Sequence, residues 1–286
     1  MNRPCNDTGR IRFGWWTTGR DEAALSLFDT VTNAMRDGVI PGDLAYVFVS
    51  KDPEEGEWSD RILERAMTLG IPTVTLSAAR FEPGLRKGDR EAWRRAYHRK
   101  VLGRIEGFRS DVVILAGYMW VVSPEACSRA ALLNLHPAAP DGPAGTWQEV
   151  IWHLLEQGAA RTGVMMHLVT QELDKGPPVT FCTFPIRGPG WDELWEEFER
   201  ERAGAGLDAI MKDMGEAQPL FARIRREGVR RELPLIVETM RSLATGRITL
   251  SEGRVLDGGG CVMPGPMDLT SEIEARIGQG GPACRN

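Results

Sequence analysis

Apolar runs about as long as a buried strand recur along the first two thirds of the chain, and segments of helical periodicity separate them. The runs lie at residues 11–17, 44–50, 71–76 and 111–124, and two more lie within 132–137 and 163–178. Strands that alternate with helices predict an α/β protein with a mostly parallel, twisted sheet, right-handed crossovers and helices on both faces. The proline at position 72 predicts that the third run is an edge strand or begins there.

The helical segments carry recognisable end signals. Residues 90–108 predict a long basic helix whose Trp93, Ala96 and Leu102 face the core. Residues 146–149, Thr-Trp-Gln-Glu, form a capping box that begins another helix.

The last third of the chain has a different pattern. Residues 179–185 alternate like a half-exposed strand, and 191–198 gather aromatic residues on one helix face, which favours docking against the protein body over a partner-binding helix. Residues 218–245 predict a helix and 247–256 a hairpin. The tail 258–286 is rich in glycine and proline, and we expect it to be poorly ordered.

Composition excludes several classes of protein. The chain has 286 residues, 42% of them apolar, and a net charge of −5, so a nucleic-acid-coating protein is disfavoured. The arginines within 223–231 are interpreted as a solvated helix face. No apolar run approaches the roughly 20 residues of a membrane span. Five widely spaced cysteines and a leader without an apolar core predict a cytoplasmic protein.

Candidate chemistry gathers where the central strands end. Asn134 and His136 lie at the end of one apolar run, and Asp174 follows another. Open α/β sheets bind ligands at the carboxyl ends of their strands, so these three side chains are expected to converge there.

Taken singly, these residues have structural explanations. A lone asparagine or histidine often satisfies neighbouring backbone groups, and His98 and His153 are interpreted in this way. His167 lies inside an apolar strand where an imidazole needs a partner, which predicts a supporting role. A metal site at His136, His167 and Asp174 is the competing interpretation, but no H-x-H, H-x-x-x-H or H-E-x-x-H spacing occurs, and we expect no metal.

The turn after the first run offers a weaker candidate. Gly19 precedes a helix, which suggests either an anion site at the helix N-terminus or a plain tight turn. Arg20 is the side chain best placed to help an anionic ligand, whereas the two acids that follow it oppose one.

Two segments together resemble the signature of the folate-dependent formyltransferases, which have a Rossmann-like sheet. These segments are Asn-Leu-His-Pro at 134–137 and His-Leu-Val-Thr-Gln-Glu-Leu-Asp-Lys-Gly-Pro at 167–177. Residues 116–125 and the C-terminal helix and hairpin also resemble the family. The resemblance implies one domain over 11–257, with a helical insertion at about 188–218 and the tail 258–286 beyond it.

The resemblance implies transfer of a formyl group from 10-formyltetrahydrofolate, as co-substrate, to a primary amine. Asn134 and His136 would donate to the developing oxyanion, and Asp174 would favour protonated His136 and relay the amine proton. Glycinamide ribonucleotide of purine biosynthesis is the default acceptor. An amino sugar, hydroxyornithine, hydrolysis of the formyl-folate, and a catalytically silent folate- or nucleotide-binding protein remain alternatives.

The resemblance also implies binding residues. Those assigned to folate are Leu115, Met119, Trp120, Val122, Thr170 and Leu173, with backbone groups holding the pterin. Gly19 and Arg20 would meet the acceptor's phosphate, although the family's turn there is smaller and less acidic, and Glu232 would contact the acceptor amine. Trp120 stands where the family usually has arginine. The partner is therefore a small-molecule amine, and the sequence does not decide whether the protein is a homodimer.

Overall fold

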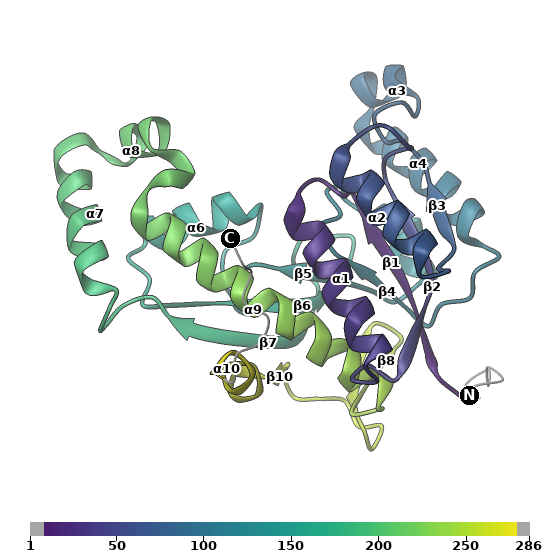
Figure 1. Ribbon diagram of the computed structural model, residues 1–286. Helices are drawn as coiled ribbons and strands as arrows, with labels where there is room; N and C mark the ends of the chain where they lie inside the picture. Colours follow the sequence, from purple (N-terminus) through teal and green to yellow (C-terminus); the bar gives the residue numbers. More distant parts are fainter. Residues whose placement is uncertain (1–8, 279–286) are drawn as a thin grey trace. The chain divides into compact units, whose positions relative to one another are not determined.

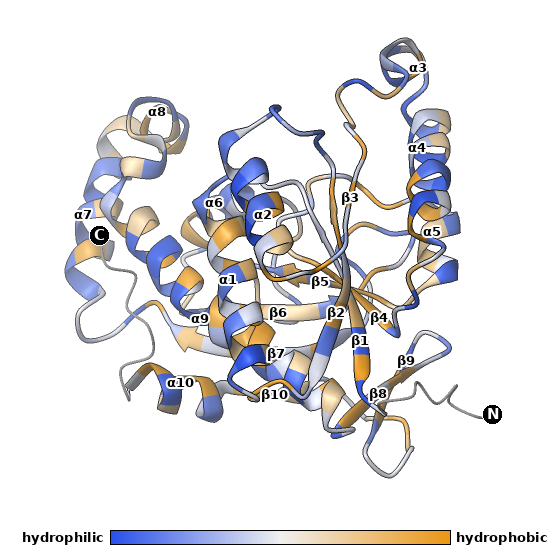
Figure 2. Cartoon of the chain, turned by 45° about the vertical axis from the view of Figure 1, so that its right-hand side comes forward, coloured by the Kyte–Doolittle hydropathy of each residue, from blue (hydrophilic) through white to orange (hydrophobic). Residues whose placement is uncertain are grey.

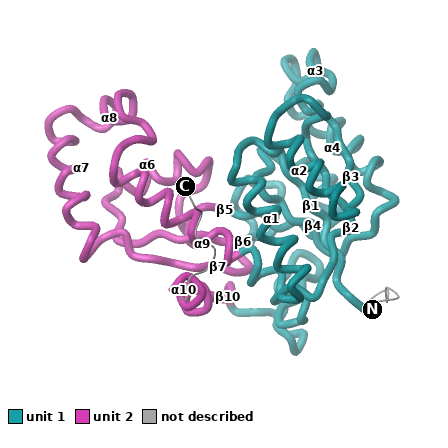
Figure 3. The backbone as a smooth tube through the Cα atoms, viewed as in Figure 1, with its two compact units in different colours: residues 1–135, 167–177, 236–264 teal, residues 136–166, 178–235, 265–286 magenta. Residues whose placement is uncertain are grey.

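The computed structural model describes residues 9–278, which divide into two compact units (Figures 1 and 3). Unit 1 comprises the chain up to residue 135 together with 167–177 and 236–264, and unit 2 comprises 136–166, 178–235 and the chain from 265. The predicted domain 11–257 is thus shared between two interleaved units. The predicted leader at 1–8 and the end of the predicted tail at 279–286 lie outside the described residues.

Unit 1 is built on a parallel sheet, as predicted, with the strands in the order β5-β4-β1-β2-β3. These strands are β1 (Ile11–Thr17), β2 (Gly42–Val49), β3 (Thr73–Thr75), β4 (Val112–Leu115) and β5 (Leu132–His136), the last of which reaches the boundary of the unit. β3 lies at the edge, as the proline at position 72 predicted. The strand order changes direction between β4 and β1.

Helices cover both faces of this sheet (Figure 1). They are α1 (Glu22–Arg36) and α2 (Glu57–Thr68) on one face, and α4 (Arg90–Ile105) and α5 (Pro124–Arg129) on the other, with the short α3 (Pro83–Gly88) directly before α4 (Figure 2). Two consecutive tryptophans of β1 point to opposite faces of the sheet. Trp15 packs on Phe28 of α1 with ring centroids 5.8 Å apart, whereas Trp16 belongs to the core cluster that packs against α4. Both are fully buried, which is why the strands lack polar alternation (Figure 2).

The inward face of α4 differs from the one predicted. Its buried residues are Trp93, Tyr97, His98, Val101 and Ile105, while Ala96 and Leu102 are only half-buried. Trp93 is buried as predicted, and Leu102 packs against the core cluster from the edge of this face. The prediction for Ala96 was wrong because the buried stripe follows the four-residue spacing from Trp93, which includes a tyrosine.

Unit 2 contains β6 (Arg161–Leu168) up to Met166, β7 (Pro178–Pro185) and β10 (Met267–Asp268), which pairs in parallel with β7. Its helices are α6 (Trp147–Glu156), α7 (Asp192–Ala205), α8 (Leu207–Asp213), the 3₁₀ turn η1 (Gly215–Ala217), the first part of α9 (Pro219–Ala244) and α10 (Thr270–Gly278). Trp195 and Phe198 of α7 are buried in its core, which confirms the predicted docking of this helix. The capping box of α6 is also confirmed.

The C-terminal region contains more structure than predicted. β8 (Ile248–Ser251) and β9 (Arg254–Asp257) form the predicted antiparallel hairpin in unit 1. The expectation of a poorly ordered tail was wrong over 267–278, where β10 and α10 form. Leu269 and Ile273 are fully buried there, and the Asp268 side chain accepts a hydrogen bond from the first amide of α10.

One arginine of α9 is not solvated as predicted. Arg231 is buried, ion-paired with Glu227 at 2.8 Å and Glu274 at 2.7 Å, and its guanidinium stacks 4.2 Å from the centroid of the Phe184 ring. Two carboxylates compensate the desolvation of this cation, which the spacing of charges along one helix could not reveal. No helix within 9–278 is both long and apolar enough to cross a membrane.

Candidate active site

The carboxyl ends of β5, β4, β1 and β2 lie side by side in unit 1. Leu115 is paired with Asn134 on one side and with Trp16 on the other, so the residues that follow these strands emerge at one edge. The strand order reverses between β4 and β1, and ligands of open α/β sheets bind at that position. We call residues 17–20 the acceptor turn and residues 117–122 the folate loop, after the ligands that the resemblance to the formyltransferases predicts for them.

Three of the predicted side chains, those of Asn134, His167 and Asp174, meet within unit 1 at this edge. The side-chain nitrogen of Asn134 lies 3.1 Å from Nε2 of His167, and Oδ1 of Asp174 lies 3.7 Å from the same Nε2. His167 is buried and its Nδ1 lies 2.9 Å from the carbonyl oxygen of Leu168. The structure thus brings Asn134 and Asp174 together through His167.

The hydrogen bonds define the proton on His167. A carbonyl oxygen only accepts, so Nδ1 carries a hydrogen and, in the neutral ring, Nε2 is the acceptor for the Asn134 amide. One N–H of Asn134 is then held by His167, and its second N–H remains to donate elsewhere.

Asp174 is positioned by a tight loop between β6 and β7. Leu168 N–H donates to the Pro177 carbonyl at 3.0 Å, which closes the loop. At Gly176 a Cβ atom would lie 1.6 Å from the Leu168 carbonyl oxygen, so only glycine fits. Asp174 itself has φ of 54°, a conformation that aspartate tolerates better than most residues.

His136, the third predicted catalytic residue, belongs to unit 2. Its ring is buried and Nε2 lies 3.0 Å from the carbonyl oxygen of Pro143, to which it donates. The loop of 137–145 therefore turns back to hold the imidazole, with Gly142 N–H bonded to the Ala139 carbonyl at 2.9 Å. Asn134 and His136 are alternate residues of β5, which places them on the same side of the strand.

Comparison with known proteins identifies the family. The model for "Formyl transferase" matches residues 23–189, more than half of the chain. The chain belongs to the formyl transferase family. Phosphoribosylglycinamide formyltransferase of Escherichia coli (strain K12) is 34% identical over 165 residues, which cover 56% of this chain and 68% of that protein. The enzyme of the same name from Schizosaccharomyces pombe is 28% identical over 179 residues, covering 60% and 83%.

Solved structures of a transformylase and of a deformylase share the fold. Glycinamide ribonucleotide transformylase 1 from Symbiobacterium toebii aligns with a TM-score of 0.58 and 22% identity over 89% of this chain and 97% of that one. A formyltetrahydrofolate deformylase from Pseudomonas syringae aligns with a TM-score of 0.57 and 17% identity over 87% and 66%. At these identities the likeness establishes the fold alone.

The residues that the formyl transferase resemblance assigned to folate divide into two groups. Met119 and Leu173 are exposed, at 45% and 55%, and Thr170 is also exposed, whereas Leu115 and Val122 are buried in the core of unit 1. The apolar surface offered to a ligand thus comes from the loops and not from β4.

The Trp120 side chain is held in place by the protein. It is half-buried, its Nε1–H donates to Ser50 Oγ at 3.2 Å, and it packs on Trp93 with ring centroids 5.3 Å apart. This leaves the backbone of Trp120 as the part predicted to meet folate.

The acceptor turn is a tight turn whose amides are largely engaged. Thr18 N–H donates to the Gly117 carbonyl at 3.1 Å, and Gly19 N–H to Thr17 Oγ1 at 3.1 Å. Gly19 has φ of 57°, and a Cβ there would lie 2.6 Å from the Ser59 Cα. Asp21 caps α1 by accepting from Ala24 N–H at 3.2 Å, so the helix N-terminus holds its own carboxylate.

Positive charge at this turn comes from side chains. Lys51 Nζ lies 3.3 Å from the Gly19 carbonyl oxygen, and Arg20 is exposed. Within residues 9–278, neither Arg20 nor Lys51 is engaged in an ion pair. Lys51 was not predicted as a site residue, although its position two residues after β2 places it beside the turn that follows β1.

Glu232 lies in unit 2 on α9. It is buried and accepts a hydrogen bond from Arg225 at 2.7 Å, and the Arg225 guanidinium stacks 4.5 Å from the ring centroid of Trp147. The carboxylate predicted to contact the acceptor amine therefore already has a protein partner.

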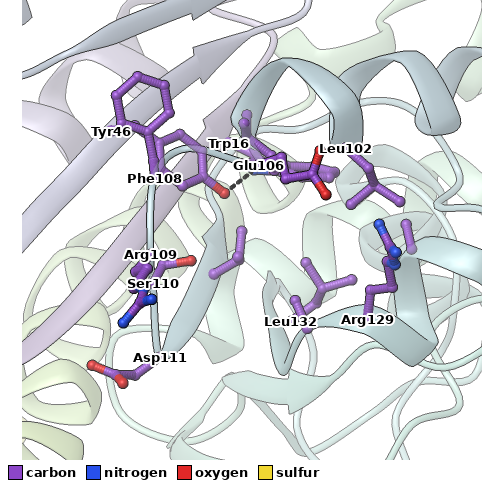
Figure 4. Close-up of a pocket in the computed structure, with 14 residues that line it drawn as sticks. Trp16, Tyr46, Leu102, Glu106, Phe108, Arg109, Ser110, Asp111, Arg129 and Leu132 are labelled. Carbon is purple, nitrogen blue, oxygen red and sulfur yellow. Dashed lines mark hydrogen bonds between the residues drawn. The ribbon is translucent and has the colours of Figure 1, made fainter. Parts of the chain in front are cut away.

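No group of three or more histidine, cysteine, aspartate or glutamate side chains that could hold a metal occurs among the described residues. A cavity of about 380 Å³ in unit 1 is bordered by α4, α5 and the amino-terminal ends of β4 and β5, including Asp111, Arg129 and Leu132 (Figure 4). None of the predicted site residues lines it.

Proposed function

We propose that this protein transfers the formyl group of 10-formyltetrahydrofolate to the amine of glycinamide ribonucleotide, a reaction of purine biosynthesis. The observation that carries the proposal is the convergence of Asn134, His167 and Asp174 at the strand ends of a chain in the formyl transferase family. Relatives named phosphoribosylglycinamide formyltransferase support the acceptor.

The proposed chemistry uses hydrogen-bond donors aimed at a developing oxyanion. The co-substrate supplies a formyl carbon on nitrogen, and its carbonyl oxygen becomes negative as the amine nitrogen forms a bond to that carbon. The free N–H of Asn134 donates to this oxygen, and we retain His136 as the second donor. Asp174 accepts the proton of the amine, through water, and the proton goes to the folate nitrogen as its bond to carbon breaks.

The loops at the strand ends fit a flat, partly apolar co-substrate. Met119, Val121 and Leu173 are large apolar side chains that remain exposed in the loops after β4 and β6. Exposed apolar groups at a ligand edge favour binding by removing them from water. We propose that they contact folate, together with the backbone of Trp120 and Val122 and the loop from Thr170, while Leu115 supports this wall from beneath.

The acceptor's phosphate is proposed to bind Arg20 and Lys51 at the acceptor turn. Thr17 and Asp21 already accept hydrogen bonds from backbone amides of this segment, so fewer amides remain to bind an anion. The positive side chains of Arg20 and Lys51 would bind the phosphate instead. We retain Glu232 as the contact of the acceptor amine, shared with Arg225. The reaction requires no metal, and we expect it to occur in the cytoplasm.

The test is a turnover assay in which the release of deformylated folate is followed with and without glycinamide ribonucleotide. We expect turnover only with the acceptor, and its loss by a factor of about 10²–10³ in Asn134→Ala. Equal turnover without any amine would make the protein a hydrolase. Binding of folate without turnover, with every amine tried, would instead favour a silent binding protein.

A further inference from the structure

Two buried hydroxyl groups link the acceptor turn to the folate loop. Thr18 follows β1 and Ser50 follows β2, and their hydroxyl oxygens are 3.0 Å apart. Both residues are buried, with exposures of 8% and 2%. Buried hydroxyls require hydrogen-bond partners, and here the partners come from the two binding segments.

The folate loop supplies an obligate donor to each hydroxyl. Met119 N–H donates to Thr18 Oγ1 at 3.0 Å, and Trp120 Nε1–H donates to Ser50 Oγ at 3.2 Å. In return, the Gly117 carbonyl accepts from Thr18 N–H at 3.1 Å. Ser50 can then donate its own hydrogen to Thr18, so the donors run in one direction from Trp120 through Ser50 to Thr18.

The indole of Trp120 is also fixed from its other side. Its ring packs on Trp93 with centroids 5.3 Å apart, and the Arg86 guanidinium lies 5.8 Å from its centroid. Arg86 in turn donates to the Ala78 carbonyl at 3.2 Å. The indole N–H therefore reaches Ser50 from a ring whose orientation is set by packing and not by the hydrogen bond alone.

From these contacts we infer that Thr18, Ser50 and Trp120 are positioning residues that couple the binding of the two substrates. The inference rests on the proposed function. A ligand that shifts the folate loop also shifts the acceptor turn, because the two segments share this chain of hydrogen bonds. The second substrate then meets a turn that the first has already positioned, so each substrate strengthens the binding of the other by the same factor.

Calorimetric titration tests the coupling directly. The affinity for glycinamide ribonucleotide is measured with and without saturating 5-formyltetrahydrofolate, which keeps the pterin but carries its formyl group on the other nitrogen. We expect the wild-type protein to bind the acceptor at least about fivefold more tightly with the folate present. In Ser50→Ala and in Trp120→Phe the enhancement is expected to fall below about twofold.

Matched variants separate coupling from folding. Ser77 is another buried serine of unit 1, hydrogen-bonded to Glu55 at 2.9 Å and outside this chain of bonds, so Ser77→Ala should retain the enhancement. Ser50→Thr keeps a hydroxyl and should retain it as well. The double variant Ser50→Ala/Trp120→Phe should lose no more coupling than either single variant, because both break one chain.

The inference is overturned if wild-type protein turns over glycinamide ribonucleotide but shows no enhancement, or if Ser50→Ala keeps it. It is likewise overturned if Ser77→Ala loses the enhancement to the same extent at an unchanged melting temperature. Absence of wild-type turnover in the assay with glycinamide ribonucleotide would reject the proposed function itself, which distinguishes the two failures.

Discussion

Nε2 of His167 lies 3.1 Å from the side-chain nitrogen of Asn134, while Nδ1 of the same ring is bonded to the carbonyl of Leu168 at 2.9 Å. The backbone thus selects the tautomer, and the tautomer holds one hydrogen of the Asn134 amide. The second hydrogen is directed by the planar geometry of that amide. In the proposed reaction this is the hydrogen that donates to the oxyanion.

Removal of the His167 ring should misplace this donor without deleting it. We expect His167→Ala to lower kcat by up to about 10²-fold, with little change in the KM for folate, because a small misplacement of a catalytic group has an effect of that size. His167→Gln, whose side-chain oxygen can accept from Asn134, should recover part of the rate. Steady-state kinetics at saturating acceptor measure both, and wild-type kcat in His167→Ala would contradict the assigned role.

Asp174→Asn should remove the group that accepts the proton of the amine. A carboxamide cannot take up that proton, so we expect kcat to fall by about 10²–10⁴-fold with little change in the KM for folate. Steady-state kinetics at saturating acceptor test this, and a wild-type kcat in Asp174→Asn would contradict the assigned role.

Gly176 should be intolerant of any side chain. A Cβ atom there would overlap the Leu168 carbonyl, so Gly176→Ala must open the loop that carries Asp174. We expect a lower kcat and a loss of roughly 1–3 kcal/mol in the free energy of unfolding. Gly107→Ala is the matched control, because nothing lies within 4 Å of its Cβ position. Equal activity of the two variants would show that the loop is not constrained there.

His98 should make stability depend on pH through its burial. Burial lowers the pKa of His98 to about 4, against 6.5 for an unperturbed histidine. The unfolded chain therefore takes up a proton first, and stability present above pH 6.5 is lost as pH falls from 6.5 towards 4. The loss between pH 7 and pH 5 should be roughly 2 kcal/mol.

Urea denaturation of variants tests this assignment. His98→Phe keeps an aromatic ring beside Trp16 and should remove that part of the pH dependence. His153 is exposed, so His153→Gln should retain the wild-type dependence. Identical pH dependence in His98→Phe and wild-type protein would assign the effect to other groups.

The sequence predicted the parts of the site that depend on strand ends. Asn134 and Asp174 follow apolar runs, and parallel topology was sufficient to bring them to one edge. Their link through His167 was foreseen only as a supporting role, because hydrogen-bond partners depend on loop conformation that periodicity does not report. Gly176 shows the reason: a backbone contact inside unit 1 determines where Asp174 lies.

Other features were not predicted because they depend on contacts between residues far apart in the sequence. Arg231 belongs to a basic helix segment, yet it is buried because Glu274 comes from a helix more than 40 residues later. The same helix α10 was missed because glycine and proline dominate the residues before it, whereas Leu269 and Ile273 decide its packing. Thr18 and Ser50 carry no motif, and their pairing follows only from the adjacency of β1 and β2.

The most direct test of the proposed function is to follow an isotopic label in the formyl carbon. Wild-type protein is incubated with 10-[¹³C]formyltetrahydrofolate and glycinamide ribonucleotide, and the label is located by NMR. We predict that the label leaves the folate only when the acceptor is present and appears in equal amount as the formyl amide of the acceptor. Release of the label as formate at the same rate with and without acceptor, or its retention on folate, would contradict formyl transfer.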